Sequence, residues 1–244
     1  MRKKKVGAIA IKSFALLVVL GTACLAKAQD ATTPYPNMAP VDQYLMTDQG
    51  AEIALARSAA PDSISRDADV LILGRHGFET AVKGKNGFVC IVGRGWTSAA
   101  DPEYWNPKVR VPMCVNAAGA RSYLLRITKI TELALAGHTL DQVNEAIAKK
   151  ELPPMEPGAM CYMMSKDAYL NDGGGHNMAH LMFYTPLMDG AVWGANPIDD
   201  SNHVSFKFPN SPIFLTPQFL GDPEPMDNFV VPTRVWSDGT PDQM

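Results

Sequence analysis

Strand-like segments flank one strongly helical stretch in the middle of this chain. Between residues 120 and 135, apolar side chains recur at helical spacing, and Thr139 followed by Gln142 is typical of the start of a second helix. Apolar or alternating runs that favour strands come before and after this helix pair, at residues 68–73, 78–83, 87–92, 110–115, 159–164 and 178–184. Because strands and helices cluster instead of alternating, we predict an α+β fold with a central antiparallel sheet.

The two ends of the predicted domain differ from its middle. An N-terminal helix is expected over residues 41–60, which Pro61 ends. The turn residues 85–87 (Lys-Asn-Gly) between the second and third strands are typical of a hairpin, so the first three strands are expected to form an antiparallel meander. Seven prolines within residues 209–241 predict a mostly irregular C-terminal segment with one strand at 229–236.

The first 28 residues have the pattern of a secretory signal. Four basic residues follow Met1, residues 13–25 are largely apolar, and residues 26–28 (Ala-Lys-Ala) have the small-x-small form of a signal-peptidase site. We therefore expect an exported protein, periplasmic or extracellular, that is cleaved after Ala28. The alternatives are an uncleaved N-terminal anchor and lipid attachment at Cys24.

Removal of this signal changes the charge of the chain. Residues 1–28 hold six of the 22 basic residues and none of the 25 acidic ones, so 16 basic residues face 25 acidic ones, a net charge of −9. Such an acidic chain is unsuited to nucleic acid, and no later apolar run is long enough to span a membrane. Residues 29–40 are Pro-rich and predict a flexible lead-in, and residues 41–244 are expected to form a single domain.

Three cysteines follow the predicted cleavage site. Cys90 and Cys114 each lie in a strand-like run, and these runs would be joined by a polar, Pro-containing loop. If the two strands are neighbours, a disulfide between these cysteines is expected, because exported proteins reach an oxidising environment. Cys161 would then be left over, and buried free thiols are the alternative for all three.

A short motif between the first two strands resembles the phosphate-binding box of the histidine phosphatases. The segment 71–80 reads LILGRHGFET. The resemblance implies that Arg75 clamps a phosphate and that His76 is the phosphoryl acceptor. It covers about ten residues, and strand and turn signals follow where that family has a helix. The alternative is a polar turn between two strands.

Methionine and histidine alternate in the predicted strand after a glycine-rich turn. His176, Met178, His180 and Met182 would share one face of the sheet, with Cys161 and Met163 on the facing strand. Imidazole, thioether and thiolate are ligands for copper or zinc, and neighbours two apart in a strand lie about 7 Å from each other. The pattern predicts a metal or small-ligand site, and half-buried packing is the alternative.

Aromatic residues mark a third candidate site. Trp96, Tyr104 and Trp105 border one loop and could line a pocket for a flat or sugar-like ligand, although buried rim aromatics are the equal alternative. Phosphate-binding P-loops, dinucleotide-binding fingerprints and HExxH or paired-cysteine zinc patterns are absent from the sequence.

The chain also resembles a family of exported bacterial proteins that combine an NGFVC strand with a GAMCYMMS…HLMF hairpin. Here these motifs are residues 86–90, 158–165 and 180–183. The resemblance implies export and one domain, and it carries no activity across. We expect a small-ligand- or metal-binding accessory protein. A phosphate-ester hydrolase that uses Arg75 and His76 is one alternative, and a structural or interaction protein without an active site is the other.

Overall fold

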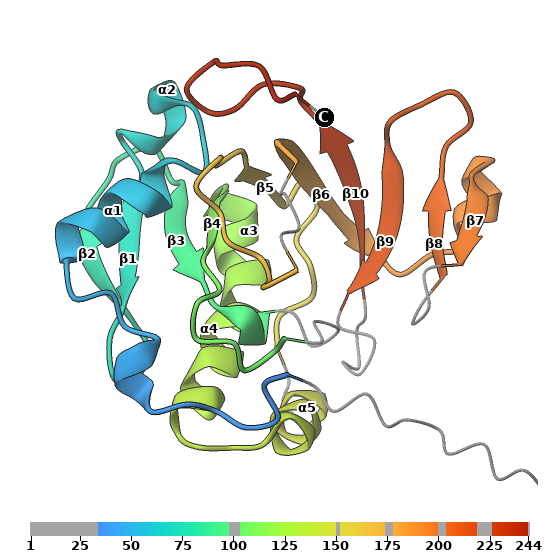
Figure 1. Ribbon diagram of the computed structural model, residues 1–244. Coiled ribbons are helices and arrows are strands. Elements are labelled where there is room, and N and C mark those ends of the chain that lie inside the picture. Colours follow the sequence, from blue (N-terminus) through green and yellow to red (C-terminus); the bar gives the residue numbers. More distant parts are fainter. Residues whose placement is uncertain are drawn as a thin grey trace, which may run out of the picture. The chain divides into compact units, whose positions relative to one another are not determined.

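The computed structural model describes residues 34–97, 103–149, 152–173, 178–199, 204–218 and 226–243. The predicted signal, Cys24 and His176 lie outside these ranges. The described strands form one ten-stranded mixed sheet in the order β2-β1-β3-β4-β5-β6-β10-β9-β8-β7 (Figure 1). Their bounds are β1 Asp69–Leu73, β2 Phe78–Val82, β3 Val89–Gly93, β4 Val111–Val115, β5 Met160–Met163, β6 His180–Pro186, β7 Asn196–Asp199, β8 Val204–Lys207, β9 Phe214–Gln218 and β10 Met226–Pro232.

Five α-helices and three short 3-10 helices accompany the sheet in the described part of the chain. They are η1 Val41–Gln43, α1 Gln49–Arg57, α2 Asp62–Ser65, η2 Gly95–Thr97, α3 Ala117–Arg121, α4 Tyr123–Leu135, α5 Leu140–Ala148 and η3 Gly190–Trp193. The predicted α+β class with one large sheet is confirmed. No helix among the described residues is long and apolar enough to cross a membrane.

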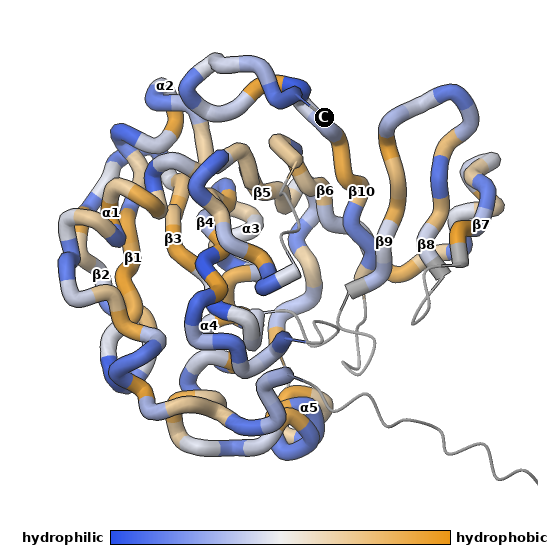
Figure 2. The backbone as a smooth tube through the Cα atoms, in the orientation of Figure 1, coloured by the Kyte–Doolittle hydropathy of each residue, from blue (hydrophilic) through white to orange (hydrophobic). Residues whose placement is uncertain are grey.

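The sheet is buried on both faces where helices cover it. Cys90, Val92 and Cys114 pack with Ala56 of α1 on one face. The alternate residues of the same strands, such as Ile91 and Met113, pack with α4 on the other face, as the period of two in a strand requires. Figure 1 shows α1 in front of β1 and β3, with α3 and α4 behind the sheet. The hydrophobic colouring along β1 in Figure 2 follows from this two-sided burial.

The predicted antiparallel meander of the first three strands is wrong, because the second and third strands are not neighbours in the sheet. β1 lies between β2 and β3, antiparallel to β2 and parallel to β3. The connection from β2 to β3 crosses the start of β1, where the carbonyl of Asp67 accepts hydrogen bonds from the N–H groups of Lys85 and Asn86. A Cβ on Gly84 would lie 2.3 Å from the Asp67 oxygen, so only glycine fits this crossing. The Asn-Gly pair therefore forms part of a crossover and no hairpin.

Two predicted helices are shorter than expected. The helix expected over 41–60 begins at Gln49, because Asp48 caps it by accepting the N–H of Ala51. The helix expected over 120–135 is broken at Ser122, where the backbone leaves helical geometry at φ −128° and ψ −75°. The Ser122 hydroxyl donates to the carbonyl of Ala118 at 2.7 Å, which stabilises the end of α3.

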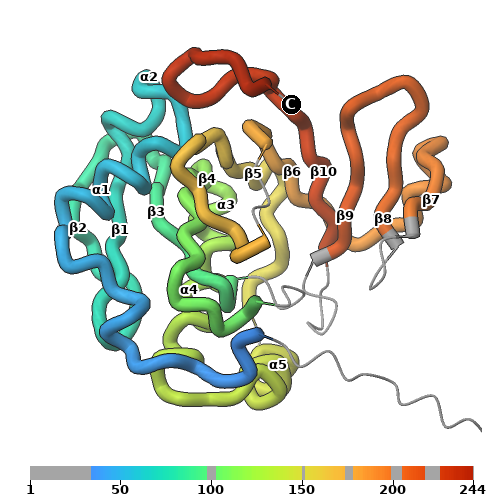
Figure 3. Tube along the Cα trace, viewed as in Figure 1, coloured from blue at the N-terminus to red at the C-terminus, as the bar shows by residue number. Residues whose placement is uncertain are grey.

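The C-terminal segment is more regular than predicted. β9 and β10 are full strands, and β10 pairs with β6 over seven residues. Pro217 in β9 lies beyond the two residues that pair with β8, so its missing N–H interrupts no pairing on that side. In the C-terminal loop, red in Figure 3, the N–H of Ser237 donates to the carbonyl of Met164 at 2.9 Å.

Cys90 and Cys114 form a disulfide between β3 and β4. They are directly opposite each other in the antiparallel register of these strands. Cys161 on β5 is a buried free thiol and belongs to the core cluster on the opposite face of the sheet. The expected pairing is therefore present, and the third thiol is the one left over.

Candidate functional site

Arg75 and His76 lie in the tight turn that joins β1 to β2. The N–H of Gly74 donates to the carbonyl of Gly77 across this turn at 2.8 Å. Both side chains are exposed, and the guanidinium of Arg75 pairs with the carboxylate of Asp42. His76 makes no hydrogen bond within the described part of the chain. The geometry is that of an exposed polar turn, and the predicted phosphoryl-transfer roles of these two residues stay predictions.

The predicted hairpin of β5 and β6 is present with the expected facing residues. Cys161 lies opposite Met182, and Met163 lies opposite His180. Cys161, Met163 and Met182 belong to the core cluster beneath α4, and Met178 packs against it. The face that was predicted to bind a ligand is therefore largely covered by the protein itself.

Burial sets the protonation of the hairpin's titratable groups. It raises the pKa of the Cys161 thiol to about 12, so the thiol stays protonated at neutral pH, whereas metal ligation requires the thiolate. It lowers the pKa of His180, whose Nδ1 lies 2.7 Å from the carbonyl oxygen of Met178. The described residues contain no cluster of three or more His, Cys, Asp or Glu side chains arranged for a metal. The copper or zinc site thus stays a prediction, and His176 lies outside the described residues.

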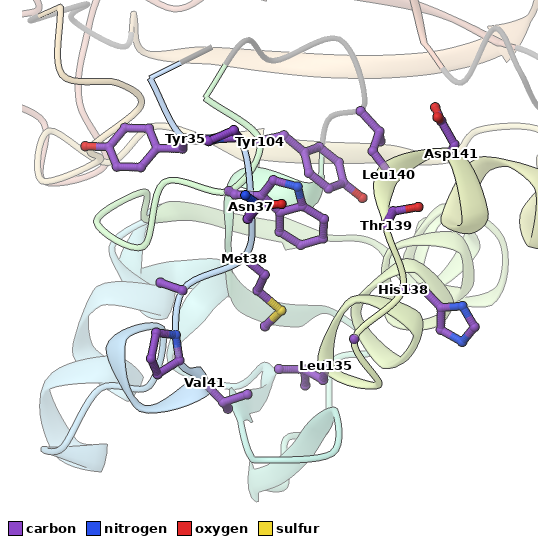
Figure 4. Close-up of a pocket in the computed structure, with 15 residues that line it drawn as sticks. Tyr35, Asn37, Met38, Val41, Tyr104, Leu135, His138, Thr139, Leu140 and Asp141 are labelled. Atoms are coloured by element: carbon purple, nitrogen blue, oxygen red, sulfur yellow. The ribbon is translucent and has the colours of Figure 1, made fainter. Parts of the chain in front are cut away.

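A cavity of about 740 Å³ lies between three segments that are distant in sequence. Its walls are residues 35–40 of the expected lead-in with Val41, then Tyr104 with Trp105, and the turn between α4 and α5 from Leu135 to Asp141 (Figure 4). The first described residues, blue in Figure 3, pass beside α5 to form one of these walls. We define this cavity as the aromatic pocket.

The two aromatic side chains that line the pocket beside the lead-in, Tyr104 and Trp105, belong to a buried aromatic cluster. The rings of Trp96 and Tyr44 lie 4.6 Å apart, and Tyr104 meets Trp105 edge to face, also at 4.6 Å. The indole N–H of Trp96 donates to the hydroxyl of Thr131 on α4 at 3.1 Å. Edge-to-face packing contributes about 0.5–1.5 kcal/mol beyond burial, so these rings hold one another in place.

Tyr44 connects two of the pocket's walls. Its hydroxyl donates to the carbonyl of Trp105 at 2.7 Å and accepts the N–H of Ala39 at 3.0 Å. The carbonyl of Tyr44 accepts in turn from Nε of Arg94 at 2.8 Å. Arg94 is fully buried and forms an ion pair of 2.9 Å with Glu52 on α1. The pocket is therefore anchored to the core of the sheet through Tyr44.

A second network holds the outer end of the lead-in wall. The carboxylate of Asp172 accepts hydrogen bonds from the hydroxyls of Tyr35 and Tyr169 and from Nζ of Lys108, the last at 3.0 Å. The pKa of Asp172 is lowered by its hydrogen bonds with these donors, and that of Tyr35 is raised by its hydrogen bond with Asp172. The described part of the lead-in is thus attached to the domain at Tyr35 and at Ala39.

The remaining wall is the α4–α5 turn. Gly137 has a φ of +86°, the left-handed conformation that commonly follows a helix. Thr139 and Gln142 form the capping box that their spacing predicted at the start of α5. This turn places His138, Thr139 and Asp141 at the rim of the pocket.

One polar group in the pocket has no partner. The side chain of Tyr104 is 4% exposed, and its hydroxyl makes no hydrogen bond with a described residue. Figure 4 shows this hydroxyl pointing toward Thr139 and Leu140 across the cavity. Burial raises the pKa of Tyr104, so the group stays protonated and keeps its donor. An unpaired buried hydroxyl costs about 1–3 kcal/mol, which a ligand oxygen in the pocket would offset.

No family model, curated protein or solved structure matches this chain.

The sequence pointed to only part of the pocket. Tyr104 and Trp105 were candidates because of their aromatic pairing in a loop. The lead-in wall was missed because Pro-rich composition indicates irregular structure without showing where it packs. Tyr35 and Met38 were the sequence signal that the lead-in packs on the domain, since both are large apolar side chains and are partly buried against the aromatic cluster.

Proposed function

We propose that the protein is exported and binds a small, uncharged ring compound in the aromatic pocket. The observation that carries this proposal is the buried, unpaired hydroxyl of Tyr104, a residue that lines the cavity together with Trp105. Small-ligand sites are typically apolar cavities with a few polar groups that fix orientation. The pocket fits this description, and its unpaired donor requires an oxygen or nitrogen acceptor on the ligand.

The charge of the pocket narrows the class of ligand. Asp141 and His138 lie at the rim, and among the described residues neither a lysine nor an arginine lines the cavity. An anionic ligand would therefore meet no permanent counter-charge. A sugar or a hydroxylated aromatic ring supplies both a flat face for Trp105 and an acceptor for Tyr104.

Replacement of Tyr104 by Phe tests the proposal. We expect the free variant to melt at the same temperature as wild type or higher, because an unpaired buried hydroxyl is removed. We also expect its affinity for ring ligands to fall about 3- to 10-fold, the value of one hydrogen bond. Binding is measured by tryptophan fluorescence and by NMR with a panel of monosaccharides and hydroxylated aromatic compounds.

Tyr162→Phe is the matched control, because Tyr162 lies on β5 outside the pocket. Its affinity for every ring ligand should equal that of wild type. The proposal fails if no compound of the panel binds wild type, or if Tyr104→Phe binds as tightly as wild type does.

The two other predicted functions, phosphate-ester hydrolysis and metal binding, are tested separately. Turnover of a generic phosphomonoester by wild type and His76→Ala addresses the hydrolase. Metal analysis of purified protein with His176→Ala and His180→Ala addresses the metal site. The exposed turn around His76 and the covered hairpin face offer less support for these functions than the aromatic pocket offers for ligand binding.

A further inference from the structure

A second cavity, of about 830 Å³, lies on the C-terminal half of the sheet. Its lining comes from the segment before β6, from β7 to β10, and from the C-terminal loop. Met178, Phe214 and Pro232 give it an apolar side, and Lys207, Arg234 and Asp242 give it three charged groups. Lys207 and Phe214 lie directly opposite each other on β8 and β9.

Asp242 is fixed by the backbone on two sides. Its Oδ2 accepts the N–H of Ala179 at 2.8 Å, and its own N–H donates to the carbonyl of Arg234 at 2.9 Å. Its Oδ1 is buried and has no partner among the described residues. Burial of a carboxylate oxygen without a hydrogen-bond donor costs free energy, so a donor or a cation supplied by a ligand would stabilise this side chain.

The two cations of the cavity, Lys207 and Arg234, are exposed to solvent. Neither Lys207 nor Arg234 has a side-chain hydrogen bond or ion pair with a described residue. Arg234 has a φ of +60°, a left-handed conformation that costs a non-glycine residue about 1–2 kcal/mol. Such conformations are concentrated at functional sites, where the surrounding structure imposes them. Here the pairing of Asp242 with the Arg234 carbonyl holds the arginine at the cavity.

We propose that this cavity binds a free α-amino acid with an apolar side chain. The ligand carboxylate would bind Lys207 and Arg234, and the ligand ammonium would pair with the carboxylate of Asp242. The apolar side chain would pack on Met178, Phe214 and Pro232. This site is separate from the aromatic pocket and does not depend on the function proposed for it.

Three compounds with the same apolar side chain separate the contribution of the ligand ammonium from that of the ligand carboxylate. L-Leucine carries both charges, 4-methylpentanoate lacks the ammonium, and 3-methylbutylamine lacks the carboxylate. NMR titration of the full mature chain should show binding of leucine with a Kd below about 10 mM, and weaker binding of both analogues. L-Isoleucine, L-methionine and L-phenylalanine complete the panel.

Two variants test the charged groups. Asp242→Asn keeps an acceptor for the Ala179 N–H, and it should weaken leucine about tenfold or more while 4-methylpentanoate binds as before. Lys207→Gln should weaken leucine and 4-methylpentanoate and leave 3-methylbutylamine unchanged. Lys83→Gln is the control. Lys83 is exposed and follows β2, the edge strand at the opposite end of the sheet from β7, so this variant should bind all three compounds as wild type does.

The melting temperature of each variant shows whether it is folded. If Asp242→Asn is unfolded, the proposal is tested by the affinity of Lys207→Gln for leucine compared with that of wild type. The proposal is overturned if none of the four amino acids binds wild type below about 10 mM, or if leucine binds Lys207→Gln as it binds wild type.

Discussion

At the scale of single residues, buried polar groups divide into those with partners and those without. Arg94 and Glu52 are both buried and pair with each other and with backbone groups, so they stabilise the region around Tyr44. The hydroxyl of Tyr104 and Oδ1 of Asp242 have no such partner among the described residues, and each borders a cavity. These two unpaired groups therefore coincide with the candidate binding sites, whereas others, such as the hydroxyl of Tyr184 and the amide of Asn228, line neither cavity.

His180 gives a prediction at this scale, because its burial makes stability depend on pH. Burial lowers the pKa of His180 in the folded chain from its ordinary value of 6.5, which applies to the unfolded chain. Above pH 6.5 both states hold a neutral ring. Below it the unfolded chain binds the proton first, so the free energy of unfolding falls with pH until the folded pKa is reached.

The measurement is urea unfolding of wild type and His180→Asn between pH 8 and pH 5. Asn keeps a donor for the carbonyl of Met178 and does not titrate. Wild type should lose more stability than the variant as the pH falls below about 6.5. Parallel pH profiles for the two proteins would contradict the burial of a neutral imidazole.

At the scale of elements, Gly84 decides the connection of the sheet. A side chain there would meet the backbone of Asp67 and Ala68, which has no room to move away. We predict that Gly84→Ala lowers the free energy of unfolding by about 1–3 kcal/mol or more, as overpacking of a tight contact does. Gly50→Ala is the control, since its Cβ would meet only the side chain of Asp48 in the first turn of α1.

Gly50→Ala should leave stability unchanged or raise it by up to about 1 kcal/mol, because alanine favours a helix. Thermal melting of both variants checks the pair. Equal melting temperatures for Gly84→Ala and wild type would show that the crossover does not approach β1 as closely as the structure shows.

The same element shows how far the sequence alone could predict this fold. Hydrophobic periodicity located β1 to β6, and the spacing of Thr139 and Gln142 located the capping box of α5, since both are local patterns. The disulfide of Cys90 with Cys114 was expected only if their strands were neighbours, which the structure shows. The crossover at Gly84 depends on contact with a segment 17 residues earlier, which no local pattern contains. The aromatic pocket joins three distant segments for the same reason, so only Tyr104 and Trp105 were identified beforehand.

At the scale of the whole molecule, the sheet has two dissimilar halves. Helices α1 and α3 pack on β1, β3, β4 and β5, and α4 completes the core there. In the other half, β10 to β7 pair with one another, and η3 packs on β7 and β8. Met226 and Val230 of β10 still belong to the core cluster beneath α4. The aromatic pocket belongs to the helical half and the second cavity to the other. A ligand at either site should thus stabilise a different part of the chain.

The disulfide between Cys90 and Cys114 lies in the helical half and is compatible with export. It closes a loop with a sequence separation of 24, and a cross-link of this size stabilises the folded state by about 3 kcal/mol, mainly by restricting the unfolded chain. We predict that a reductant lowers the midpoint of guanidinium unfolding by the corresponding amount in wild type.

Two variants complete this prediction. A Cys90→Ala, Cys114→Ala double variant should be less stable than wild type and insensitive to reductant. Cys161→Ala should respond to reductant as wild type does, because Cys161 is the free thiol. Loss of the reductant effect in Cys161→Ala would instead place Cys161 in the bond. The pairing across β3 and β4, and with it the register of the two strands, would then be wrong.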